Sequence, residues 1–432
     1  MQIIKNLLQS QMGLTSIYGI GMIAVYLLSI LIAKNYGAEG IGIYSISSRI
    51  LTLLTLIAVS GTNIAVLRNL SKLDQNKNSI YVRMFYDIAT KRVLILSFFL
   101  SIILYISSSY ISNEIFQNKN YESAFKLIAF LIPFSAIAQL NKDFLRGLKL
   151  FMLSETLRNL IVPLINILIV IISIYLSYNM LITPIYGLAF GVITVCIFSL
   201  FYILNKHKKN YTSTDGKYKN DFLKSSFLIF QGQILALLNA QITLYFLEIF
   251  SSTENVGIFH VHQRIAILCI IPLTISNIKM GPKISELFKH KKLYLKKLLK
   301  TNVNIIFPLS MIIGFIIIIS SNIILGFFGE EFNQKKIVLY LLIFSQIFSV
   351  FCGPSTLFLL MTGYEDRLRR NMVAVLIFSI ISNYVLISNF DVIGAGLAFA
   401  LNIIFLNTCN ALTIKYLTNF QTFFNPLKRS GN

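Results

Sequence analysis

The stretch VLILSFFLSIILYISSSYIS, residues 93–112, contains no charged side chain. At a rise of about 1.5 Å per residue, a helix of this length crosses the roughly 30 Å of hydrocarbon in a bilayer. NIIFPLSMIIGFIIIISSNIIL, residues 304–325, has the same character. Both stretches are continuously apolar instead of alternating, which favours membrane helices over the strands of a barrel.

The composition extends this interpretation to the whole chain. Of 432 residues, 56% are hydrophobic and 13% are charged, and the mean hydropathy is +0.72. A soluble core does not bury so much apolar surface, so we predict an all-α polytopic membrane protein. Apolar windows and polar breaks predict twelve transmembrane helices, near 14–33, 43–66, 93–112, 124–140, 156–178, 184–204, 225–249, 258–279, 303–326, 337–361, 372–388 and 394–417.

The basic residues predict the orientation. Of the 38 Lys and Arg, 31 lie at the N-terminus, in breaks after even-numbered spans with the adjoining span ends, or in the C-terminal tail. Five follow odd-numbered spans and two lie within spans. By the positive-inside rule both termini are cytoplasmic. The net charge of +21 therefore indicates topology and contact with anionic membrane lipids, and we expect no nucleic-acid partner.

The sequence contains an internal repeat. At an offset of 215 residues, Gly42 aligns with Gly257 and Arg49 with Arg264. The pair Arg158-Asn159 recurs as Arg370-Asn371 at an offset of 212, and the tetrapeptide GLAF at 187–190 recurs at 396–399 at an offset of 209. Six spans per half make the halves parallel, with a central cavity expected at their interface. The predicted domains are an N-lobe of residues 1–204, a flexible cytoplasmic linker of 205–224, a C-lobe of 225–417 and a cytoplasmic tail of 418–432.

Two arginines lie inside predicted spans. A cation there costs about 2.5 to 3.5 kcal/mol on insertion scales, so a partner, water or an anion has to offset the cost. We expect Arg49 and Arg264 to be cavity cations that contact an anionic substrate. A structural salt bridge is the alternative for Arg264, because Glu248 lies near the outer end of the seventh span. Glu248 is therefore a candidate gating salt bridge, whereas Ala33 occupies the equivalent position in the first half.

Other polar side chains recur at helical spacing near the arginines. They either line a wet cavity or join helices by hydrogen bonds. The candidates for the polar lining of the substrate site are Tyr18, Tyr26, Thr52, Asn63, Gln231, Gln241 and His260.

The sequence contains no catalytic motif, and we predict no enzyme activity, no cofactor and no metal. His260 and His262 are two residues apart, so they point to different faces of a helix and form a poor metal pair. The four cysteines all lie in apolar runs without a CxxC pair.

Several segments carry a family resemblance: KNYGAEGIGIYSISSRI (34–50), LRNLSK (67–72), VGIFHVHQRI (256–265), PLTISNIKMGPKISEL (272–287), RGLK (146–149) and TGYEDRLRRN (362–371). The chain resembles the Wzx-type polysaccharide flippases of the multidrug/oligosaccharidyl-lipid/polysaccharide exporter superfamily. The resemblance implies a MATE-like fold of two six-helix lobes around a cationic central cavity, with Arg49 and Arg264 as the cavity cations.

The resemblance also implies an activity. It is alternating-access transfer of an undecaprenyl-diphosphate-linked oligosaccharide repeat unit from the cytoplasmic to the periplasmic leaflet of the bacterial inner membrane. Such a flippase serves O-antigen and other surface polysaccharide biosynthesis, with a polysaccharide polymerase and a chain-length regulator as candidate partners.

Two alternatives stay open. A cation-coupled drug antiporter of the same fold requires an intramembrane carboxylate in the first lobe, and none falls within the first six predicted spans. A non-transporting scaffold of a polysaccharide assembly complex would leave the buried arginines without a role.

Overall fold

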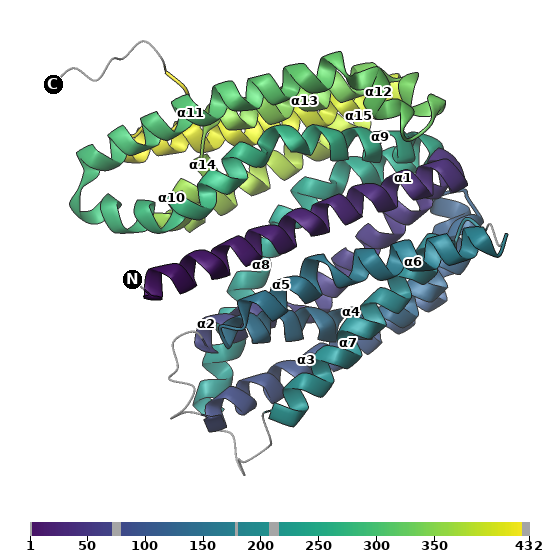
Figure 1. The fold of residues 1–432 in the computed structure, drawn as a ribbon, viewed down its shortest axis with the longest axis horizontal. Coiled ribbons are helices and arrows are strands. Elements are labelled where there is room, and N and C mark those ends of the chain that lie inside the picture. The colour runs from purple at the N-terminus through teal and green to yellow at the C-terminus, as the bar shows by residue number, and fades with distance from the viewer. Residues whose placement is uncertain (1, 71–78, 178–179, 207–215, 426–432) are drawn as a thin grey trace. The chain divides into compact units, whose positions relative to one another are not determined.

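The computed structural model describes the chain except residues 1, 71–78, 178–179, 207–215 and 426–432 (Figure 1). All secondary structure of the described residues is helical, which confirms the predicted fold class. The chain divides into two compact units, Met1–Ile234 and Leu235–Asn432. This boundary lies inside helix α8 (Gly216–Phe250), not in the predicted linker of residues 205–224. The prediction of a flexible linker is therefore wrong for residues 216–224, which are helical. Residues 207–215 lie outside the described residues.

Unit 1 is built around α4, against which α1, α3 and α7 pack. A π-helical turn, Ile111–Ile115, follows α3. The buried apolar side chains of unit 1, among them Tyr86, Phe144 and Leu157, form a continuous core along its helices. Besides the first part of α8, the helices of unit 1 are α1 (Gln2–Val59), α2 (Thr62–Leu70), α3 (Ser79–Tyr110), α4 (Asn120–Gly147), α5 (Phe151–Asn159), α6 (Ile161–Tyr175) and α7 (Thr183–Lys206).

Unit 2 has its long helices α11, α13 and α15 side by side (Figure 1). Short 3₁₀ turns occupy Ile267–Ile270 and Glu330–Asn333. Its helices are the end of α8, then α9 (Thr253–Ala266), α10 (Ile271–His290), α11 (Lys292–Ile319), α12 (Ser321–Gly326), α13 (Lys336–Cys352), α14 (Ser355–Met361) and α15 (Glu365–Thr418).

Within the described ranges, nine helices are long and apolar enough to cross a membrane, or ten if the bent pair α13 and α14 forms one span. Two of them, in α1 and α15, contain a non-helical residue, Gly37 (φ 66°) and Asp391 (φ 53°). Each of these long helices therefore covers two of the predicted spans. The chain is a multi-pass membrane protein, and twelve crossings stay a prediction.

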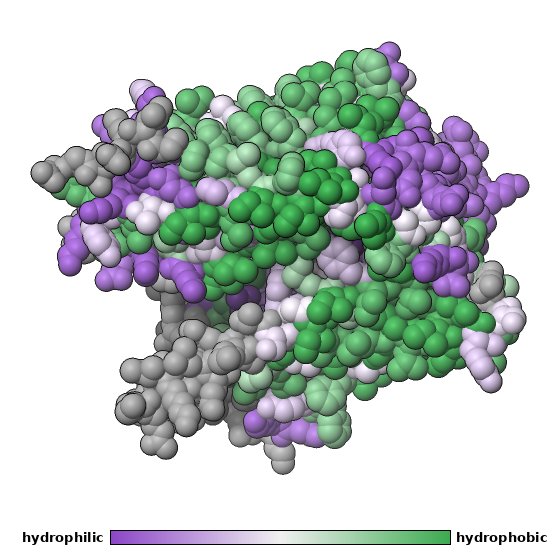
Figure 2. Space-filling model, turned by 45° about the horizontal axis from the view of Figure 1, so that its top comes forward, coloured by the Kyte–Doolittle hydropathy of each residue, from purple (hydrophilic) through white to green (hydrophobic). Residues whose placement is uncertain are grey.

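Apolar side chains cover the middle of the helices and hydrophilic side chains gather at helix ends (Figure 2). At one end of unit 2, the exposed lysines Lys291, Lys292, Lys296 and Lys297 surround the start of α11. Helices with apolar flanks and charged ends suit a solvent that is hydrocarbon in the middle and water at both faces.

The non-helical residue inside α15, Asp391, is held by polar contacts in unit 2. The Asp391 carboxylate accepts hydrogen bonds from Ser251 Oγ and from Asn255 Nδ2, the latter at 2.8 Å, and Lys335 Nζ lies 4.0 Å away. A left-handed backbone is costly for any residue with a Cβ. These contacts explain why an aspartate is held there.

The repeated GLAF tetrapeptide gives a test of packing. A Cβ on Gly187 would lie 2.1 Å from Asn166 Oδ1 and 3.0 Å from Asn166 Cα, whereas on Gly396 the nearest atom is Leu341 Cδ1 at 3.2 Å. Gly187→Ala should lower the melting temperature of the detergent-purified protein, because overpacking costs about 1–3 kcal/mol. Gly396→Ala, the matched control, should melt close to the parent. Equal melting temperatures for the two variants would contradict the close contact in unit 1.

Candidate functional site

The two arginines predicted as cavity cations both precede the end of a helix. Arg49 lies ten residues before the end of α1, and Arg264 lies in the last turn of α9. Arg49 is half-buried in α1, and its Nε donates to Ser45 Oγ one turn earlier at 3.4 Å. α1 ends at Val59, and Ser60 and Gly61 have positive φ before α2 begins. The predicted span 43–66 is therefore broken, because Gly61 adopts φ 75° and its Cα approaches the backbone of α8 too closely for a Cβ.

Arg264 lies in the last turn of α9 in unit 2, and it too is half-buried. The helix tightens into the 3₁₀ turn Ile267–Ile270 immediately afterwards, and α10 begins with Pro272 near its first residue. The predicted span 258–279 is thus also interrupted. Tight turns inside a long helix often mark a hinge. Each unit therefore carries one arginine that precedes a departure from regular α-helix, ten residues later in unit 1 and immediately afterwards in unit 2.

Glu248 is buried near the end of α8, where its Oε1 accepts a hydrogen bond from Thr253 Oγ1 at 2.7 Å. This contact joins α8 to the start of α9, the helix that carries Arg264. The gating salt bridge between Glu248 and Arg264 stays a prediction.

The predicted polar lining falls into three groups. Tyr18 and Thr52 are exposed, Tyr26, Gln231 and Gln241 are half-buried, and His260 is buried in α9. Gln231 belongs to unit 1 and Gln241 to unit 2, although both lie on α8. Asn63 is buried in a polar cluster of unit 1, where a carboxylate holds its amide.

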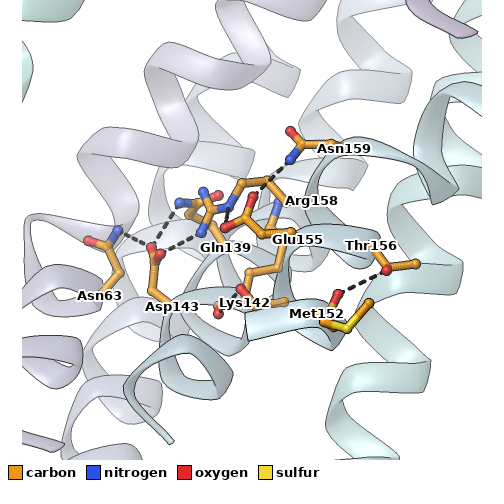
Figure 3. Close-up of polar contacts among 10 residues, drawn as sticks. Asn63, Gln139, Lys142, Asp143, Met152, Glu155, Thr156, Arg158 and Asn159 are labelled. Carbon is orange, nitrogen blue, oxygen red and sulfur yellow. Dashed lines mark hydrogen bonds and ion pairs between the residues drawn. The ribbon is translucent and has the colours of Figure 1, made fainter. Parts of the chain in front are cut away.

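That cluster is centred on Asp143, whose side chain is almost fully buried in α4 (Figure 3). Its Oδ2 accepts hydrogen bonds from Asn63 Nδ2 at 2.6 Å and from Gln139 Nε2 at 3.0 Å. Its Oδ1 lies 2.5 Å from a terminal nitrogen of Arg158 in α5. Three donors from α2, α4 and α5 therefore converge on one carboxylate.

Further contacts extend the cluster along α5. Asn159 donates to Glu155 Oε2 at 2.8 Å, and Ser154 Oγ donates to the backbone oxygen of Lys142 at 2.8 Å (Figure 3). Since α5 is only nine residues long, the Ser154 hydrogen bond and the ion pair of Arg158 hold it against the end of α4, whereas the Asn159–Glu155 bond lies within α5.

The structure adds a buried carboxylate that the predicted spans of the first lobe do not include. The predicted fourth span ended near residue 140, but α4 continues to Gly147 and carries Asp143 in its last two turns. The polar sequence NKDFLRG masked this, because a hydropathy window averages away a single buried carboxylate whose partners lie elsewhere in the chain. The repeated Arg-Asn pair was the available signal.

At the corresponding position, unit 2 has hydrogen bonds between uncharged side chains. Asn371, the repeat counterpart of Asn159, donates to Asn410 Oδ1 at 2.9 Å and to Thr413 Oγ1 at 3.1 Å. Asn410 in turn donates to Thr356 Oγ1 at 3.1 Å. Arg370, the counterpart of Arg158, is exposed. Unit 1 therefore uses an ion pair where unit 2 uses amides and hydroxyls.

The described residues contain no candidate metal site. Over the described ranges, no three His, Cys, Asp or Glu side chains are grouped as metal ligands. His262 is fully buried, and its Nε2 lies 3.0 Å from the backbone oxygen of Phe332. It joins α9 to the turn before α13.

The Asp143 cluster gives a stability prediction. Asp143→Asn should lower the stability of the detergent-purified protein by about 1–3 kcal/mol, because it removes the closer of the two carboxylates that pair with the partly buried Arg158 guanidinium. The double variant Asp143→Asn with Arg158→Gln should recover part of the loss. The measurement is thermal unfolding of the four proteins of this cycle.

Glu122→Gln is the matched control on the same helix. Glu122 pairs with Lys126 at 2.7 Å, but the two side chains are 32% and 43% exposed, so its removal should change the melting temperature far less. If Asp143→Asn melted like Glu122→Gln, the cluster would not be stabilising unit 1.

Comparison with known proteins was made on the whole chain. No curated protein sequence matches it significantly. Among solved structures, it is similar to the lipid II flippase MurJ in an inward closed conformation, with TM-score 0.73, 16% identity, and coverage of 93% of this chain and 87% of that one. An inward-facing MATE-family multidrug resistance transporter of the MOP superfamily gives TM-score 0.76 at 12% identity, covering 92% and 94%.

A MOP superfamily transporter from Pyrococcus furiosus is similar with TM-score 0.67 and 15% identity, covering 94% of both chains. At these identities the similarity shows the fold, which is that of the MOP transporters. The family described as "Polysaccharide biosynthesis protein" matches residues 7–288. Because that match covers more than half of the sequence, the chain belongs to the polysaccharide biosynthesis protein family.

Proposed function

We propose that this protein is a flippase that moves an undecaprenyl-diphosphate-linked oligosaccharide repeat unit from the cytoplasmic to the periplasmic leaflet. Transport by alternating access in the bacterial cytoplasmic membrane would supply surface polysaccharides such as O-antigen. Membership of a polysaccharide biosynthesis family and a fold shared with a lipid II flippase support the transport of a lipid-linked saccharide.

The observation that carries the choice of an anionic cargo is the position of Arg49. It lies in the long apolar helix α1, and its repeat counterpart Arg264 lies in the last turn of α9, within the apolar stretch Thr253–Gly281 of the other unit. A guanidinium binds phosphate oxygens bidentately and keeps its charge at any physiological pH. A diphosphate head group is the part of such a cargo that hydrocarbon rejects most strongly. We therefore propose that Arg49 and Arg264 each contribute to binding the diphosphate.

The membrane potential supports the proposed direction of transport. With the inside negative, each negative charge moved outward is favoured by about 2.3 kcal/mol per 100 mV. The lysines around the start of α11 support a cytoplasmic location for that end of unit 2. We propose that both termini are cytoplasmic as well.

The antiporter alternative needs a carboxylate that can accept a cation. Asp143 is a buried carboxylate of unit 1 that lies beyond the predicted fourth span. Both of its oxygens already accept hydrogen bonds, and Arg158 supplies the compensating charge. An incoming Na⁺ or H⁺ would have to displace these donors. Asp143 therefore serves better as a structural anchor than as a coupling site, and the flippase is the stronger proposal.

Arg49→Gln should reduce surface glycan by about 10- to 100-fold in cells that depend on this protein. The reason is that hydrogen bonds to charged groups contribute about 1.5–3 kcal/mol. Arg49→Lys keeps the charge but loses the bidentate geometry, so it should retain intermediate export. Surface glycan is measured by immunoblot alongside protein abundance in the membrane fraction.

The matched control is Arg146→Gln, which removes an exposed arginine at the end of α4. It should leave export unchanged. Normal surface glycan in Arg49→Gln at normal abundance would overturn the cargo assignment. A scaffold would give that result, and an antiporter would instead change drug sensitivity.

The proposed gate gives a separate test. If Glu248 and Arg264 exchange contacts during transport, Glu248→Gln and Arg264→Gln should each lower export, and the double variant should be no worse than the more severe single variant. Additive losses in the glycan assay would mean that the two side chains act independently.

A further inference from the structure

The span formed by α13 and α14 in unit 2 is broken in its middle. α13 ends at Cys352, α14 begins at Ser355, and the two axes differ by 43°. Gly353 at the break has φ 68°, and Pro354 has no amide hydrogen. A broken helix leaves backbone carbonyls without intrahelical partners, and hydrocarbon supplies none. Another part of the protein has to cover this break.

The chain's own C-terminal end lies on it. α15 ends at Thr418, and residues 420–424, FQTFF, form what is here named the C-terminal strap. The backbone N–H of Phe424 donates to the backbone oxygen of Phe351 at 2.9 Å. A Cβ on Gly353 would lie only 2.3 Å from the backbone oxygen of Thr422. The strap therefore binds a carbonyl next to the break and fits only because residue 353 has no side chain.

Residues 418–432 were predicted to be a cytoplasmic tail, and their location in the cytoplasm stays a prediction. The strap itself packs into unit 2 through its aromatic rings. The ring centroids of Phe424 and Phe307 are 4.6 Å apart, and those of Phe420 and Phe358 are 5.3 Å apart. Lys296 Nζ lies 5.3 Å from the centre of the Phe420 ring. The strap thus joins α11 to the bent pair.

The docked strap is held differently from a helix or a strand. Its attachment relies on ring contacts and on the Phe424 backbone bond. Thr422 is 2% exposed, and its Oγ1 is buried without a hydrogen-bond partner among the described residues. Such an unsatisfied hydroxyl costs about 1–3 kcal/mol, which release into water would remove. Docking therefore has both a strong apolar attraction and a built-in penalty.

We propose that the C-terminal strap is a latch on unit 2. While docked, it completes the backbone of the broken span and holds the bend between α13 and α14. A change in that bend requires the strap to leave, since the Thr422 carbonyl occupies the space beside Gly353. The partner of this surface is the chain's own C-terminal segment, so the proposal goes beyond cargo transport and does not depend on the identity of the cargo.

Thiol labelling of the full-length protein in detergent tests the docking. Thr422→Cys should react with a maleimide at least tenfold more slowly than Gln421→Cys, because residue 422 is buried and its neighbour is exposed. The parent, with its native cysteines, gives the background rate. Equal rates for the two variants would overturn the proposal.

Gly353→Ala is the releasing variant and Gly363→Ala its matched control. Both glycines have left-handed φ, 68° and 85°, but nothing lies within 4 Å of a Cβ at Gly363. Added to Thr422→Cys, Gly353→Ala should raise the labelling rate towards that of Gln421→Cys, and Gly363→Ala should not. The same rate with both alanines would show that close approach at Gly353 does not hold the strap.

Two controls keep the outcome clear. A symmetrical gel-filtration peak shows that each variant is folded, and Phe424→Ala replaces Gly353→Ala as the releasing change if that variant aggregates. Surface glycan should fall several-fold in Gly353→Ala relative to Gly363→Ala, and this arm alone rests on the proposed function. Faster labelling with unchanged glycan, in cells where Arg49→Gln abolishes export, would overturn the latch and leave the flippase standing.

Discussion

Hydrocarbon offers no hydrogen-bonding partner, and this constraint shapes every element of the protein. All secondary structure of the described residues is helical because a helix satisfies its backbone groups within one segment. At two of the helix interruptions, another part of the chain approaches closely. α8 lies against Gly61, and the C-terminal strap lies against Gly353. The breaks are therefore tolerated because tertiary contacts cover them.

The same constraint explains how the two units treat polar side chains at corresponding places. Unit 1 buries the Asp143 carboxylate and neutralises it with Arg158, which belongs to a short helix that needs an anchor. Unit 2 uses Asn371, Asn410 and hydroxyl groups, and it exposes the second arginine of the repeat. A buried ion pair contributes little net stability but is costly to break. The two units thus use different chemistry at corresponding positions of the sequence repeat.

For a flippase, this difference separates two kinds of buried charge. The guanidinium of Arg158 is committed to a carboxylate within unit 1, and it positions α5. Arg49 has a neutral hydroxyl, Ser45 Oγ, as a neighbour on its own helix, and it lies before a break in that helix. Both proposed cargo contacts therefore precede a departure from regular α-helix, at Ser60 and Gly61 in unit 1 and at Ile267–Ile270 in unit 2.

The sequence by itself determined the class of fold, the duplication and the basic helix ends. These properties are sums over many residues, since hydropathy is read over windows of about 20 residues and the repeat over half the chain. It also marked Arg49 and Arg264 as unusual, because a charge in an apolar run is visible locally. Only the tertiary structure decided that Asn63 binds Asp143, 80 residues away, and that Phe424 binds Phe351. Such partners depend on which helix ends meet in space, and no local pattern of residues records that.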